Sequence, residues 1–191
     1  ATYDAHWQSE QVFELRVRCL ERRRNRLASA VDELTEAPDP AALLQSAILP
    51  FKLPALDPCA DGPALAEDGM PPEDPELRER HAELRRRLDH AEALRESGRF
   101  DPALALATAA RDEAIALNDQ ALLAEALEHL GRIQAEGQSM RTAKATLERA
   151  IVVANRAGDD PLAAQAWLSL LYAAAVQGEL DEAEHRAIGA E

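Results

Sequence analysis

The sequence predicts an all-α fold made of antiparallel helical hairpins, and three observations support this prediction. Alanine, leucine, glutamate and arginine dominate the 191 residues, whereas the β-branched residues that favour strands are sparse. Small residues recur at a spacing of 40 in the second half of the chain. A glycine precedes each copy, as a turn between two helices would require. Stacked hairpins of this kind offer a surface rather than a reaction centre.

The repeated positions lie three and four residues apart, which places them on one helix face and lets a second helix approach closely. They are Phe100, Met140 and Leu180; Ala103, Ala143 and Ala183; Ala107, Leu147 and Ala187; and Ala110, Ala150 and Ala190. The glycines just upstream of the three sets are Gly98, Gly137 and Gly178. Three in-phase copies predict three hairpins over residues 75–191, with the last one truncated at the end of the chain.

In the N-terminal region, residues 1–50, the sequence predicts one long helix and one short helix. The long helix covers 8–36, and the short helix covers 41–49 after a proline that suits a helix entry. Apolar residues at three- and four-residue spacings predict a single buried stripe on the long helix. They are Val12, Leu15, Cys19, Leu27, Val31 and Leu34.

Residues 51–74 predict an acidic, extended connector, because proline recurs there and cannot sit inside a helix. We expect Leu53, Leu56 and Leu65 to pin it to the fold. Six further helices are predicted over 75–97, 102–117, 120–136, 139–157, 161–177 and 180–190. Asp101, Asp119 and Asp160 supply caps or first-turn residues for three of them.

The net charge of −14 argues against a nucleic-acid partner, which would need a concentrated basic surface. Arg16, Arg18 and the basic run 22–26 have Glu14 and Glu21 among them, and a solvated helix face explains these charges better than an anion site. No apolar stretch reaches the roughly 20 residues that a membrane helix requires. The chain opens without methionine and stops within its last predicted helix, so we expect a fragment of a longer protein.

The paired helices resemble tetratricopeptide repeats. In that family the first helix carries large apolar residues and a glycine, and the second carries spaced alanines. The matching positions here are Leu127, Leu130, Gly131, Ala143 and Ala150, and then Trp167, Leu170, Leu171, Ala183 and Ala190. The period of 40 exceeds the family's usual period of about 34. The resemblance implies a right-handed superhelix of long hairpins.

The first 62 residues carry a second resemblance, through Trp7, Gln11, the run 15–23, Leu49-Pro50 and the run 58–61. They resemble a segment of multidomain bacterial serine/threonine kinases of myxobacterial type, where it precedes a C-terminal tetratricopeptide array. No Gly-rich phosphate loop, His-Arg-Asp or Asp-Phe-Gly motif occurs here. The resemblance therefore implies a regulatory region that does not itself transfer phosphate. It favours the extracytoplasmic side of a membrane-anchored parent, and leaves the cytoplasm open.

Cys19 and Cys59 are the two cysteines. If the array lies outside the cytoplasm, as the resemblance suggests, they could form a disulfide that pins the connector to the long helix. Closing a loop of about 40 residues would stabilise the fold by roughly 4 kcal/mol. Two buried apolar thiols in a cytosolic fold are the other reading.

No catalytic, cofactor or metal site is predicted. Glu182 and His185 have the spacing used in di-iron bundles, but no second Glu-x-x-His pair exists in the sequence. Glu125 and His129 share a helix face, which is an ordinary side-chain pairing. There is no Gly-x-Ser-x-Gly elbow, and Cys19 lies in an apolar stripe.

The first helix of each hairpin would line a concave groove, where the resemblance implies peptide binding. The predicted groove residues have mixed charge and suit a peptide or a neighbouring chain. They are Arg85, Leu88, Glu92 and Arg95; Glu125, Glu128 and Arg132; and Gln165, Leu168 and Tyr172. Trp167 is predicted to pack between helices. The expected function is protein–protein interaction within a bacterial serine/threonine kinase. The alternative is a self-association module in which another protomer covers the last helix.

Overall fold

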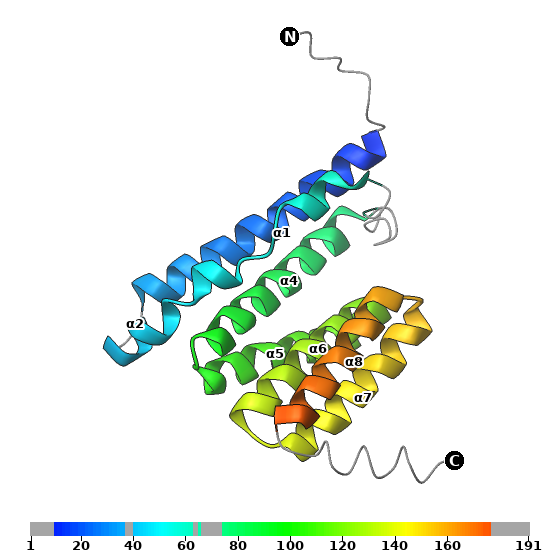
Figure 1. Cartoon of the computed structure of the whole chain (residues 1–191). Coiled ribbons are helices and arrows are strands. Elements are labelled where there is room, and N and C mark those ends of the chain that lie inside the picture. Colours follow the sequence, from blue (N-terminus) through cyan, green and yellow to red (C-terminus); the bar gives the residue numbers. More distant parts are fainter. Residues whose placement is uncertain (1–9, 37–39, 63–64, 66–73, 177–191) are drawn as a thin grey trace. The chain divides into compact units, whose positions relative to one another are not determined.

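The computed structural model describes residues 10–36, 40–62, 65 and 74–176 (Figure 1). Every regular element in these ranges is helical, so the all-α prediction is confirmed. The α-helices are α1 (Glu10–Thr35), α2 (Pro40–Ser46), α4 (Pro75–Glu96), α5 (Phe100–Ala116), α6 (Gln120–Gly137), α7 (Met140–Ala157) and α8 (Asp160–Val176). Two short 3-10 helices are η1 (Leu49–Lys52) and η2 (Asp57–Ala60). The predicted helix over 180–190 lies outside the described residues.

The chain divides into a first unit, residues 1–97, and a second unit, residues 98–191. The division falls between Ser97 and Gly98, in the turn that joins α4 to α5. Gly98 has a φ of +78°, a left-handed conformation that glycine adopts without strain.

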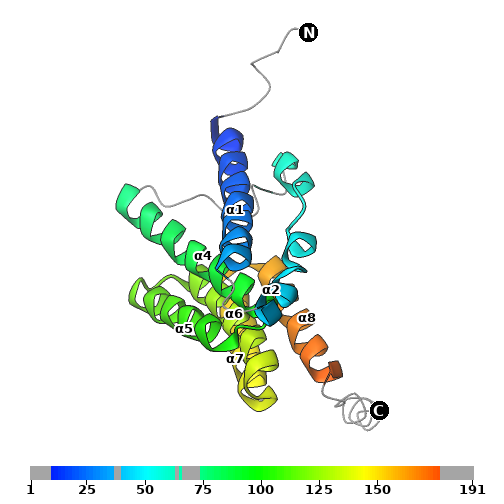
Figure 2. The ribbon, with the colours of Figure 1, turned by 90° about the vertical axis from the view of Figure 1, so that its left-hand side faces the viewer.

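In the first unit, α1 contacts α4, α2, η1 and η2. Figure 2 shows α4 on one side of α1 and the η1–η2 segment on the other. Leu15 and Ala30 are buried on α1, and so is the carboxylate of Glu33. Leu27 and Val31 are exposed instead, so the single buried stripe predicted for this helix is wrong at these two positions. The neighbours pack against a face with smaller and more polar residues than the sequence pattern suggested.

The connector is not a plain extended segment, because η1 and η2 interrupt it. A disulfide joins Cys19 of α1 to Cys59 of η2, with the two Cα atoms 5.5 Å apart. The Arg16 guanidinium donates a hydrogen bond to the Ala60 carbonyl at 2.7 Å. Leu65 is buried as predicted, whereas Leu56 is exposed and does not pin the connector.

In the second unit, α6 contacts α5, α7 and α8, and α7 contacts α8. The 40-residue pattern marks close packing, because six of its members on α5 and α7 have no exposed surface: Ala103, Ala107, Ala110, Ala143, Leu147 and Ala150. A Cβ added at Gly131 of α6 would come within 2.6 Å of the Leu147 side chain of α7. These helices therefore approach as closely as the small residues allow. The right-handed superhelix stays a prediction.

Side chains cap three of these helices at their N-termini. Asp119 accepts a hydrogen bond from the Leu122 amide, Ser139 from the Thr142 amide and Asp159 from the Leu162 amide. Each cap satisfies a backbone donor that has no partner within its helix. Gly158 ends α7 with a φ of +73°. Asp159 caps α8, and Asp160 is the first residue of that helix, one of the two roles predicted for it.

Candidate interaction surface

Four of the predicted groove residues lie on α4 in the first unit, and most of them are not open to a ligand. Leu88 is buried in the core, so its assignment to a groove is wrong. Glu92 is also buried, and the Arg95 guanidinium donates to both of its carboxylate oxygens, at 3.0 and 2.8 Å. Arg85 is half-buried.

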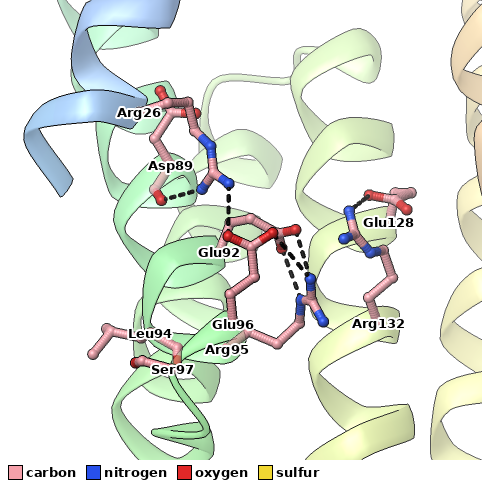
Figure 3. Close-up of polar contacts among 9 residues, drawn as sticks. All are labelled: Arg26, Asp89, Glu92, Leu94, Arg95, Glu96, Ser97, Glu128 and Arg132. Carbon is pink, nitrogen blue, oxygen red and sulfur yellow. Dashed lines mark hydrogen bonds and ion pairs between the residues drawn. The ribbon is translucent and has the colours of Figure 1, made fainter. Parts of the chain in front are cut away.

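The α4 pair belongs to a larger ionic cluster within the first unit (Figure 3). Arg26 of α1 donates to the backbone carbonyl of Asp89 at 2.8 Å and pairs with Glu96 at 3.1 Å. Arg95 lies 3.6 Å from the same Glu96 carboxylate. Burial raises the pKa of Glu96 and the neighbouring Glu92 charge raises it further, whereas Arg26 and Arg95 lower it. The cluster ties α1 to α4.

A groove of about 380 Å³ lies between α1 and α4. Its lining combines the apolar side chains of Val17 and Ala82 with charges of both signs and the buried His81. The charged lining residues are Glu14, Arg18, Glu21, Arg22, Arg78, Glu79 and Arg85. Because arginine and glutamate both line it, the groove does not present the single sign of charge that a strong anion site needs.

Three predicted groove residues lie on α6 in the second unit, and the central one is structural. Glu128 has no exposed surface. Its carboxylate accepts a hydrogen bond from the Ser169 hydroxyl of α8 at 2.7 Å and lies 3.7 Å from Arg132. Glu128 therefore joins α6 to α8, and its assignment to a ligand groove is wrong. Glu125 and Arg132 are half-buried.

The remaining predicted residues lie on α8, and all three are exposed. Gln165, Leu168 and Tyr172 are open to solvent, with Leu168 66% and Tyr172 67% exposed. Trp167 and Leu171 are also exposed, at 51% and 61%. We call Trp167, Leu168, Leu171 and Tyr172 together the α8 apolar face. About half of the Trp167 side chain is exposed, and its packing between helices stays a prediction because the helix predicted over 180–190 lies outside the described residues.

The 40-residue offset explains how sequence reasoning missed part of this face. At this offset Trp167 corresponds to Leu127 of α6 and Leu171 corresponds to Gly131 of α6. Leu127 is buried in the core, and Gly131 lies against Leu147 of α7. The segment that follows α8, as α7 follows α6, lies outside the described residues. The signal was available in the repeat, because Leu171 occupies the position where α6 has a glycine for close helix contact.

Comparisons with protein-family models, curated proteins and solved structures find no match to this chain. No described helix is long and apolar enough to cross a membrane. Within the described ranges, no three histidine, cysteine, aspartate or glutamate side chains gather as a metal site would require. Glu182 and His185 lie outside those ranges.

Proposed function

We propose that this chain is a protein-interaction module whose second unit binds a partner polypeptide through the α8 apolar face. The observation that carries this proposal is the exposure of four large side chains on one helix. Contiguous apolar surface on a soluble protein marks an interaction site more often than isolated apolar residues do. Tryptophan and tyrosine are also enriched among the residues that dominate binding energy at protein interfaces.

The partner that fits this face is a segment of polypeptide with apolar side chains of its own. Gln165 and Tyr172 add polar groups beside the apolar area, and these can fix the register of a bound segment by hydrogen bonding. The partner is a peptide, a substrate protein or a second copy of the parent. The resemblance of residues 1–62 extends the proposal to a regulatory region of a bacterial serine/threonine kinase, and the owner of the module rests on that resemblance alone.

The proposal is tested by selecting peptides from a random display library on the immobilised chain and measuring their affinity by calorimetry. We expect Leu168→Asp and Tyr172→Ala to weaken binding at least tenfold, because both remove apolar contact. Ile115→Ala is the matched control, since Ile115 is a similarly exposed apolar residue on α5. Equal affinities for the wild type and both α8 variants would overturn the proposal.

Light scattering distinguishes binding of a partner polypeptide from the alternative, self-association through α8. A partner-binding face predicts that Tyr172→Ala changes peptide affinity without changing the mass in solution. Self-association through α8 predicts a concentration-dependent dimer that Leu168→Asp dissociates.

A further inference from the structure

In the first unit, α1 has an apolar surface that the other described residues of the unit leave exposed. On the side of α1 away from the buried residues Leu15, Ala30 and Glu33, large apolar side chains are 37% to 61% exposed. These exposed residues are Phe13, Val17, Leu20, Leu27 and Val31. The described residues of the unit therefore cover the face of α1 that holds Leu15, Ala30 and Glu33, and leave the larger apolar side chains of the helix exposed.

The spacing of the exposed residues is that of a coiled-coil seam. We define the α1 seam as Phe13, Val17, Leu20, Arg24, Leu27, Val31 and Leu34, which are separated alternately by four and three residues. In heptad letters, the a positions hold Val17, Arg24 and Val31, and the d positions hold Phe13, Leu20, Leu27 and Leu34. Valine at a with leucine at d favours two parallel strands, and a single polar a residue specifies the oligomer and its register.

The charges beside the seam are complementary to a second copy in one orientation. The g positions hold Arg16 and Arg23, and the e positions hold Glu14 and Glu21. In a parallel pair, a g residue meets the e residue five positions later on the other helix, so Arg16 meets Glu21. In an antiparallel pair, g meets g and e meets e, which brings arginine to arginine and glutamate to glutamate.

Among the described residues of the unit, α4 and the η1–η2 segment lie on other sides of α1 (Figure 2). The e-position edge of the seam borders the α1–α4 groove, because Glu14, Val17 and Glu21 also line that groove. Cys19 is a c-position residue outside the seam, and its disulfide holds Cys59 away from the seam. Arg16 donates to the Ala60 carbonyl, an uncharged acceptor that leaves the positive charge of the guanidinium in place at the edge of the seam.

We infer that α1 dimerises with α1 of a second copy of this chain as a parallel, two-stranded coiled coil. The apolar seam supplies the association, the Arg16–Glu21 contacts set the parallel orientation, and Arg24 restricts the assembly to two strands. This surface is distinct from the α8 apolar face, so the inference does not depend on the function proposed above.

Sedimentation equilibrium of the full chain over a range of concentrations tests the dimer. We expect a concentration-dependent dimer whose dissociation constant rises at least tenfold in Leu20→Asp and in Leu27→Asp. Both side chains are about half exposed, so the variants should keep the circular dichroism of the wild type. Leu168→Asp is the control on the other unit and should leave the dissociation constant unchanged. A wild type that stays monomeric, or a dimer unaffected by both α1 variants, would overturn the inference.

Charge reversal tests the orientation. In a parallel pair, Glu21→Arg places two arginines together and raises the dissociation constant several-fold. Mixing it with Arg16→Glu restores both opposite-charge contacts, so the mixture should form a heterodimer tighter than either variant alone. Glu36→Arg carries the same charge change beyond the end of the seam and should have no such effect. In an antiparallel pair Glu21→Arg would instead relieve repulsion between glutamates, so a tighter homodimer of this variant would contradict the parallel assignment.

Discussion

The Ser169 hydroxyl donates a hydrogen bond to the buried Glu128 carboxylate across the α6–α8 contact, at 2.7 Å. A charge that the sequence pattern assigned to a ligand surface is thus part of the helix packing. A buried carboxylate is costly without hydrogen bonds, so the Ser169 hydroxyl helps to hold α8 against α6. The α8 apolar face is presented by a helix that is held in this way.

Removing that hydroxyl should destabilise the second unit. Ser169→Ala leaves one oxygen of Glu128 without its donor, and we expect the free energy of unfolding to fall by about 1.5–3 kcal/mol, the usual value for a hydrogen bond to a charged group. Urea unfolding followed by circular dichroism measures the loss. In a Glu128→Met background the same change should cost much less, because no buried charge remains. Equal costs in the two backgrounds would show that Ser169 acts independently of Glu128.

Close packing at Gly131 should be sensitive to a single methyl group. Gly131→Ala forces the new Cβ against the Leu147 side chain, and overpacking of this kind costs about 1–3 kcal/mol. Truncating the neighbour in Gly131→Ala/Leu147→Ala should recover part of this penalty relative to the two single changes added together. Gly158→Ala is the contrasting variant, since it meets no atom but has a positive φ, so Leu147→Ala should not relieve its cost. Thermal unfolding of the three single and the two double variants checks the difference.

The disulfide between Cys19 and Cys59 should stabilise the first unit selectively. It closes a loop with a sequence separation of 40, for which the loop-entropy relation gives roughly 4 kcal/mol. We expect the Cys19→Ser/Cys59→Ser variant to show faster amide exchange in α1 and η2, with α5–α7 unchanged. Reduction adds two hydrogen atoms, so an increase in mass of about 2 Da on reduction would show that the disulfide is present. A count of two free thiols in the non-reduced, denatured protein would rule it out.

Glu96 should make the stability of the first unit fall as the pH rises. The folded state holds the Glu96 proton more tightly than the unfolded chain does, because burial raises its pKa above the ordinary 4.5. The resulting contribution to the free energy of unfolding is fully present below pH 4.5 and is lost as the pH rises through the folded-state pKa. The wild type should therefore lose stability relative to Glu96→Gln over this window.

Glu83 provides a control for the Glu96 prediction, because its pKa is shifted in the opposite direction. Hydrogen bonding from Arg86 lowers its pKa, and Arg87 contributes to the lowering. Its contribution is present above pH 4.5 and is lost as the pH falls through the lowered pKa. Relative to Glu83→Gln, the wild type should gain stability with rising pH. Two difference curves of the same sign would contradict the assignment.

The helices α4–α8 were predictable from the sequence to within about two residues at each end, because caps, prolines and glycines are local signals. The packing of α1 was not, since Leu15 and Leu27 both fit a helical stripe and only the positions of α4 and the connector decide which is buried. Glu128 was missed for the same reason. Its burial depends on Ser169, which lies 41 residues away in the sequence.

The central claim, that the α8 apolar face binds a partner, is tested most directly by methyl NMR with a selected peptide. Leu168 and Leu171 should show the largest changes in methyl chemical shift on titration, and the buried Leu127 and the exposed Leu20 should show little change. Shifts confined to leucines of α1 or α4, or a peptide that binds without affecting Leu168 and Leu171, would contradict the claim.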